Sequence, residues 1–184
     1  MILLAALFAF IQPTPTSPRS SAADDELFCV YNALDQKTLA NMGELITDNG
    51  QDSLHEIGEY AADAVDDCEK TWKWDAEQRA VAALTASARA AIQINEQWLN
   101  ERYSHSQLQA LFNQMTDEEK YSLTIDGQSR LDARGRYKQA QQLEALFKRN
   151  QVRGTDHFSM TALFVAVARY EELRGAWTGL GQKR

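Results

Sequence analysis

The sequence predicts an all-α fold, an irregular bundle of about five to seven helices with a nearly apolar C-terminal helix packed at its centre. Beyond Ala22, no stretch shows the sustained alternation of apolar and polar residues that a half-buried strand would give. Apolar residues recur instead at every third or fourth position, between residues that commonly cap helices. The stretch from Met160 to Ala168 is apolar on nearly every side, which is typical of a helix surrounded by other helices.

Two helical segments are predicted near the beginning of the chain. Apolar residues at helical spacing cover positions 27–46, and Asp35 offers a second cap within that stretch. An Asp-Asn-Gly turn signal follows at 48–50. Ser53 and Glu56 then have the spacing of a capping box, so we expect the next helix to begin there.

Capping residues also divide the middle of the chain. Alanines are concentrated between positions 76 and 91 and favour a long helix that runs toward Tyr103. Three pairs of residues have the capping-box spacing: Asp75 with Gln78, Ser104 with Gln107, and Thr116 with Glu119. The first pair marks the start of the long helix, and the other two predict shorter helices after it.

The last two helices are predicted from apolar spacing. One covers positions 131–147, although Gly135 interrupts its first half, and the final helix runs from Phe158 to about Arg174. The glycines that follow are expected to form a loose end. A chain of this length falls within the range of one domain. We therefore expect a single helical domain over 23–178 and a flexible C-terminal tail over 179–184.

The first 22 residues have the pattern of a secretory signal peptide. Residues 2–11 are uninterruptedly apolar but too few to span a bilayer, and Ser20-Ser21-Ala22 presents small residues to signal peptidase. Two features count against this interpretation: no Lys or Arg precedes the apolar run, and Arg19 lies close to the cleavage site. We expect residues 1–22 to be cleaved, which leaves no integral membrane span and places the protein in the periplasm or outside the cell.

Cys29 and Cys68 are predicted to form a disulfide. An exported chain with two cysteines allows one intramolecular pairing, and an oxidising compartment would form it. The turn signal at 48–50 lies about midway between them, so two antiparallel helices would bring the cysteines together. For a sequence separation of 39, the loop-closure model gives at most about 4 kcal/mol of stabilisation. Two buried free thiols or an intermolecular bridge are the alternatives.

Charge is distributed unevenly along the chain. The net charge of −7 argues against general nucleic-acid binding, which depends on Lys and Arg that neutralise phosphates. Residues 24–77 hold 15 acidic against 3 basic side chains, whereas residues 78–184 hold 11 against 15. Arg130 and Arg134 begin a basic run that extends to Arg153. Either the two regions complement each other across the bundle, or the surface is dipolar and steers a charged partner.

Two sets of residues are candidates for binding. Glu59, Asp63 and Asp66 are spaced to share one side of a helix, and carboxylates suit hard cations such as calcium; a solvated face is the alternative. The second set comprises candidate contacts on a surface or in a groove, although aromatic residues at helical spacing more often belong to a core. Its members are Trp72, Trp74, Arg130 and Arg134.

Motifs for common catalytic sites are missing from the sequence. It has no Gly-x-Ser-x-Gly elbow, no phosphate-binding glycine loop and no Glu-x-x-His pair, and we expect no cofactor. The sequence is thus interpreted as that of a non-catalytic binding or interaction protein of the bacterial envelope, whose partner is an unidentified protein or small molecule. The alternative is a metal-dependent or other hydrolytic enzyme with its site inside the bundle. Histidines and carboxylates gathered in a concave pocket would favour the enzyme, whereas separated charges would favour the binding protein.

Overall fold

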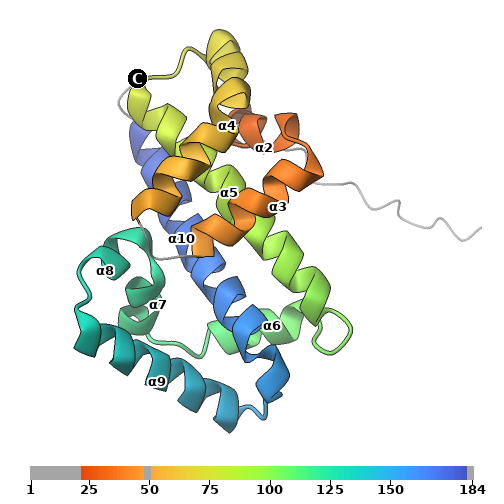
Figure 1. Ribbon diagram of the computed structural model, residues 1–184, viewed down its shortest axis with the longest axis vertical. Helices are drawn as coiled ribbons and strands as arrows, with labels where there is room; N and C mark the ends of the chain where they lie inside the picture. Colours follow the sequence, from red (N-terminus) through yellow and green to blue (C-terminus); the bar gives the residue numbers. More distant parts are fainter. Residues whose placement is uncertain (1–21, 48–50, 182–184) are drawn as a thin grey trace, which may run out of the picture.

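The computed structural model describes residues 22–47 and 51–181, and these residues form α-helices, one short 3-10 helix and no strands (Figure 1). The elements in chain order are α1 (Ala22–Leu27), α2 (Cys29–Ala33), α3 (Gln36–Thr47), α4 (Gln51–Trp72), α5 (Ala76–Leu99), α6 (His105–Phe112), α7 (Asp117–Leu123), α8 (Ile125–Ser129), α9 (Ala133–Arg149), η1 (Gly154–Asp156) and α10 (His157–Gly181). The predicted all-α class is therefore confirmed.

The number of helices differs from the prediction, because the described residues contain ten α-helices rather than five to seven. The segment predicted over 27–46 is divided between α1, α2 and α3, and the short helix α8 follows α7 without having been predicted. Helices of five or six residues complete fewer than two turns, so they display no apolar period that a sequence pattern could reveal.

The predicted capping boxes at Asp75, Ser104 and Thr116 are confirmed. Each side chain accepts a hydrogen bond from the backbone N–H three residues later, and the residue at that position accepts one from the cap in return. Asp35 caps α3 in a similar way, because its Oδ1 accepts from the N–H groups of Lys37 at 2.9 Å and Thr38 at 3.0 Å.

The start of α4 is a correction. This helix already begins at Gln51, and Ser53 lies buried within its first turn rather than before it. The turn signal predicted at 48–50 lies outside the described residues, as do residues 1–21 of the predicted signal peptide. Ala22, the last residue of that peptide, begins α1.

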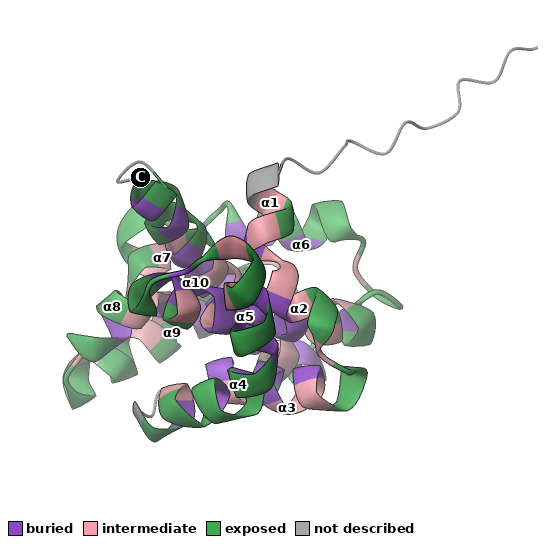
Figure 2. Cartoon of the chain, turned by 90° about the horizontal axis from the view of Figure 1, so that it is seen from above, coloured by how far each residue is buried: buried purple, intermediate pink, exposed green. Residues whose placement is uncertain are grey.

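The C-terminal helix is central, as the sequence predicts. Its most extensive contacts are with α5, and buried residues of both helices occupy the middle of the molecule (Figure 2). α10 also continues to Gly181, beyond the end expected at Arg174. Trp177 and Leu180 are buried in this extension. Their burial outweighs the helix-propensity cost of the glycines, which is about 1 kcal/mol each.

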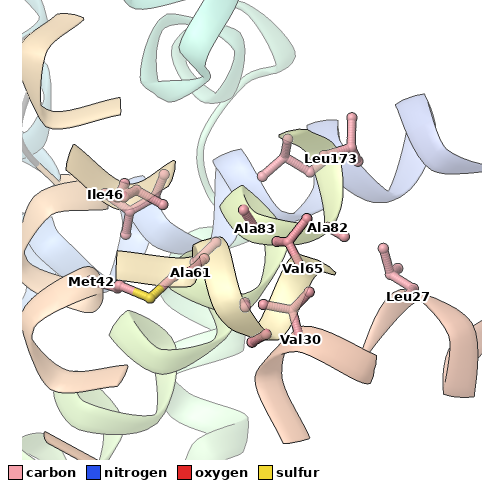
Figure 3. Close-up of a cluster of buried hydrophobic side chains, with 14 of the residues drawn as sticks. Leu27, Val30, Met42, Ile46, Ala61, Val65, Ala82, Ala83 and Leu173 are labelled. Carbon is pink, nitrogen blue, oxygen red and sulfur yellow. The ribbon is translucent and has the colours of Figure 1, made fainter. Parts of the chain in front are cut away.

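Two hydrophobic clusters make up the core. The first, called here the alanine cluster, joins α1–α4 to α5 and the second half of α10 (Figure 3). The second, called the leucine cluster, joins α6, α7 and α9 to the end of α5 and the first half of α10. Because α5 and α10 take part in both clusters, they hold the two regions together.

Close approach of α3 to α5 depends on small residues. A Cβ atom at Gly43 would lie only 3.0 Å from the backbone nitrogen of Ala91. Ser87, fully buried in α5, donates its hydroxyl to the Met42 carbonyl of α3. Helix backbones that approach this closely leave room for little more than a hydrogen atom between them. None of the helices in the described ranges is long and apolar enough to cross a membrane.

Candidate functional site

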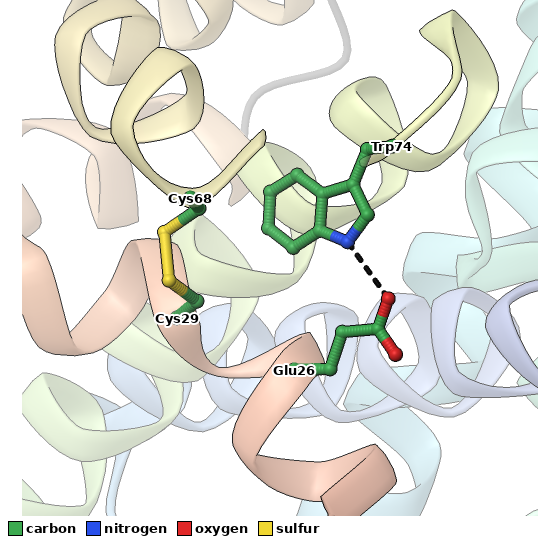
Figure 4. The surroundings of a disulfide bond; sticks show 4 residues. All are labelled: Glu26, Cys29, Cys68 and Trp74. Atoms are coloured by element: carbon green, nitrogen blue, oxygen red, sulfur yellow. Dashed lines mark hydrogen bonds between the residues drawn. A yellow bond between two sulfur atoms is a disulfide. The ribbon is translucent and has the colours of Figure 1, made fainter. Parts of the chain in front are cut away.

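The predicted disulfide between Cys29 and Cys68 is confirmed. The sulfurs are 2.07 Å apart and the Cα atoms 6.0 Å apart, so the bond joins α2 to the last part of α4 (Figure 4). Cys68 is buried, and Cys29 is half-buried against the alanine cluster. The bridge thus fixes α2 to α4, and α3 lies in the stretch of chain between the two cysteines.

Trp74, one of the predicted groove residues, belongs to the core. Its ring is 5% exposed and packs edge-on against Trp177 with the centroids 5.8 Å apart. The indole N–H donates to Glu26 Oε1 at 2.9 Å, which satisfies its polar atom. Trp72 is half-buried and packs against the same cluster. A role for either residue in ligand contact stays a prediction.

The acidic residues proposed as a metal site lie along the exposed side of α4. Glu59 Oε1 is 3.5 Å from His55 Nε2, and Asp66 forms an ion pair with Arg79 of α5, which also pairs with Glu69 at 2.7 Å. Arg79 therefore compensates two of the carboxylates near the C-terminal end of α4, where the helix dipole disfavours anions. Within 22–47 and 51–181, no three or more His, Cys, Asp and Glu residues gather as a metal site.

The basic run lies at the other end of the molecule. Figure 1 shows α9 across the lower end and α4 in the upper part. Arg130 pairs with Asp126 at 2.9 Å, and Lys148 pairs with Glu144 at 2.7 Å, so these bases find partners nearby. No ion pair within the described parts of the chain joins the acidic region before position 78 to the basic run that starts at Arg130. The two regions are nevertheless complementary in part, because Arg79 and Arg174 of the second region pair with Asp66, Glu69 and Asp24 of the first.

Two of the grooves on the bundle are formed by α5 and α10 together with other elements, and the sequence placed neither. The first, called the α6 groove, has a volume of about 400 Å³ and lies between α5, α6 and α10. Its floor is apolar and includes Ile92, Leu108, Phe112, Leu163, Phe164 and Val167. Its rim is polar and includes Glu96, His105, Gln109, Tyr170, Glu171 and Arg174. A groove of this size and composition suits a small molecule.

The rim of the α6 groove carries several charged groups. His105 Nδ1 lies 2.9 Å from Glu96 Oε1. Arg174 lies 3.9 Å from Asp24 and covers the ring of Tyr170 at 5.9 Å. Burial raises the pKa of the Tyr170 hydroxyl, so this group stays protonated at neutral pH. Glu171 is exposed and has no ion pair among the described residues.

The second groove, called the Trp98 groove, has a volume of about 510 Å³. Trp98 at the end of α5 and Phe158 at the start of α10 both line it, and their side chains are 69% and 84% exposed. Beneath them, buried Asp156 forms an ion pair of 2.8 Å with Arg102. Desolvation acts to raise the pKa of Asp156, but hydrogen bonds from Arg102 and Tyr103 outweigh it and hold that pKa below its ordinary value.

The sequence contained little to reveal these grooves. Each histidine has a carboxylate close to it in sequence, but His105 contacts Glu96, nine positions earlier, rather than Glu101. His157 contacts the Val152 carbonyl instead of its neighbour Asp156. Trp98 is one of four tryptophans in the sequence, and its position at the end of the long helix is the available sign of its exposure. No family model, curated protein or solved structure matches the chain.

Proposed function

We propose that the protein is a non-catalytic binding protein of the bacterial envelope and that the α6 groove holds its ligand, a small and largely apolar molecule with a cationic or hydrogen-bond-donating end. The observation that carries the proposal is the groove itself: an apolar floor from three helices, about 400 Å³ in volume, bounded by a polar rim. Ligand sites in helical bundles are commonly built between facing helices in this way.

The charge of the rim supports a ligand whose polar end is cationic or donates hydrogen bonds, rather than one whose polar end accepts them. Glu96 and Glu171 are both on the rim, while the one arginine there, Arg174, already lies close to Asp24. Glu171 is thus the charged group best placed to bind a ligand cation. The rings of Phe112 and Tyr170 add surfaces that already attract Lys120 and Arg174 in this structure, at 5.0 and 5.9 Å from the ring centroids.

Binding can be tested with the neutral fluorescent probe N-phenyl-1-naphthylamine. We expect its emission to rise on addition of the protein, and Val167→Phe, which fills the floor, to abolish the rise. Ser159→Phe is the matched control, because it adds the same side chain to α10 in the Trp98 groove. Gln109→Phe fills the α6 groove from the exposed face of α6, so it tests the site even if Val167→Phe disturbs the leucine cluster.

The charge preference is tested by displacement of the same probe. Decylamine should displace it at lower concentration than decanoate, and Glu171→Gln should remove that preference while leaving probe binding intact. Equal displacement by both compounds from the unaltered protein would contradict the cationic end of the ligand. Probe binding that survives both Phe substitutions in the groove would contradict the site.

A hydrolytic enzyme is the second candidate, and the contact between His105 and Glu96 is the observation that favours it. A carboxylate on Nδ1 orients an imidazole and leaves Nε2 able to accept a proton from water. Hydrolysis of p-nitrophenyl esters that disappears in His105→Gln, with probe binding unchanged, would support this candidate. Equal hydrolysis by His105→Gln and the unaltered protein would remove it.

A further inference from the structure

The lower end of the molecule combines exposed aromatic and basic side chains. We call this surface the basic-aromatic end. Its aromatic members are Trp98, Tyr137 and Phe158, which are 69%, 66% and 84% exposed. Its basic members are Arg134, Arg136, Lys138, Lys148, Arg149 and Arg153, all exposed. The basic residues lie on α9 or directly after it, and the ends of α5 and α10 reach the same end of the molecule (Figure 1).

The basic charge of this end is only partly compensated. Lys148 pairs with Glu144, and Lys138 lies 3.9 Å from Glu118. Arg134, Arg136, Arg149 and Arg153 form no ion pair within the described parts of the chain. Four arginines therefore remain to attract an anionic surface.

The opposite end would be repelled by the same surface. α4 contains seven acidic residues and one lysine, and it lies in the upper part of the molecule in Figure 1. A negative plane would thus attract α9 and repel α4, so electrostatic forces alone orient the protein. This orientation arises although the whole chain is net negative, because charges interact only over about 8 Å in physiological salt.

We propose that the basic-aromatic end docks the protein on an anionic lipid surface. A helix of 17 residues is about 25 Å long, and four basic residues on one side of it fit a plane of charged headgroups: Arg134, Lys138, Lys148 and Arg149. Tryptophan and phenylalanine beside basic residues are the side chains that enter the interfacial layer of a bilayer. Phe158 is almost fully exposed, and lipid accepts such a ring without a complementary pocket, which a protein partner would have to supply.

The test uses the whole mature protein with vesicles of phosphatidylcholine, either pure or containing 30% phosphatidylglycerol. We expect cosedimentation with the anionic vesicles at least tenfold tighter than with the neutral ones, weakened by 0.5 M salt. Arg134→Glu/Lys138→Glu should reduce this binding at least tenfold, since these residues are four positions apart on one side of α9 and each reversal replaces an attraction with a repulsion. Lys37→Glu/Lys70→Glu is the control, because it changes the net charge equally on α3 and α4 and should leave binding unchanged.

Tryptophan emission reports whether the aromatic residues take part. Trp98 is the most exposed of the four tryptophans, so we expect vesicles to shift the emission to shorter wavelength and Trp98→Phe to remove the shift.

Arg149→Gln/Arg153→Gln repeats the charge test at the other end of α9 if the first double variant does not fold. Equal binding to neutral and anionic vesicles would overturn the proposal. Binding to poly-glutamate but not to vesicles would overturn it in favour of an acidic protein partner.

Discussion

The buried residues of the alanine cluster include eight alanines and no phenylalanine, whereas those of the leucine cluster include one alanine, seven leucines and three phenylalanines. Small residues bury little apolar surface each, so the first region depends on close approach of helix backbones and on a covalent link. The second region has no disulfide and depends on large side chains that interlock. The same chain thus stabilises its two regions by different means.

The proposed binding site follows this division. The alanine cluster is tightly packed around the disulfide, and α3 and α5 approach each other so closely that no side chain fits between them at Gly43. Large side chains of the leucine cluster, among them Leu163 and Phe164, form part of the floor of the α6 groove. We therefore expect a binding site in the region of the leucine cluster, where bulky side chains make up the core.

Removal of a large side chain from the leucine cluster should have the largest effect. Phe147 is 2% exposed and contacts Phe164 and His157 with ring centroids 5.8 and 5.1 Å away. We expect Phe147→Ala to lower the free energy of unfolding by about 3–5 kcal/mol, because it leaves a cavity beneath α9. Urea unfolding measures this loss. Phe158→Ala, at an exposed position, is the control and should change stability by less than about 0.5 kcal/mol.

Loss of the disulfide should come next. Cys29→Ser/Cys68→Ser opens a loop of 39 residues, and we expect stability to fall by about 2–4 kcal/mol. Thiol titration of the denatured unaltered protein should give no free thiol before reduction and two after it. Reduction of the unaltered protein should reproduce the loss seen in the double variant. A loss greater than that of Phe147→Ala would reverse the comparison between the two regions.

Local features of this fold could be predicted from the sequence, because each depends on residues close together in the chain. The capping boxes require partners three residues apart, and the disulfide follows from there being two cysteines. Residues 160–168 are apolar on nearly every side of their helix, and this pattern identified the central helix. In each case one short stretch contains all the information that the prediction needs.

Features that depend on the placement of distant helices could not be predicted. The α6 groove is formed by three helices whose relative positions no pattern specifies, and the contact between Glu96 and His105 crosses from one helix to another. Short helices such as α2 and α8 were also missed, since one turn shows no period. The basic run was recognised as a charge pattern, but its separation from α4 became visible only in the fold.

At the Trp98 groove, exposed Arg102, just after α5, forms an ion pair with buried Asp156 in η1. Arg102→Gln leaves buried Asp156 without its main partner, which should lower stability by about 2 kcal/mol at pH 7. The pKa of Asp156 is lowered in the folded state. This stabilisation is therefore complete above about pH 3.8, and it is lost as the pH falls through the pKa that Asp156 has in the folded protein.

The measurement is urea unfolding of the unaltered protein and Arg102→Gln across this pH range. The difference in stability between them should be constant near neutral pH and should decrease below about pH 3.8. Arg130→Gln, which removes an exposed pair with Asp126, is the control and should show no measurable loss. A difference that does not change with pH would show that Arg102 acts through packing rather than through the Asp156 charge.

The smallest expected effect tests whether backbone approach limits the alanine cluster. In Gly43→Ala the new Cβ would lie 3.0 Å from the nitrogen and 3.2 Å from the Cα of Ala91, and backbone atoms cannot move aside as a flexible side chain can. We expect a net loss of about 1 kcal/mol, because strain between α3 and α5 exceeds the gain in helix propensity. Gly58→Ala is the matched control within α4, where a Cβ would meet nothing within 4 Å, and it should stabilise by about 0.5–1 kcal/mol. Thermal unfolding of both variants gives the sign directly, and stabilisation by both would mean that small residues are not what holds α3 and α5 together.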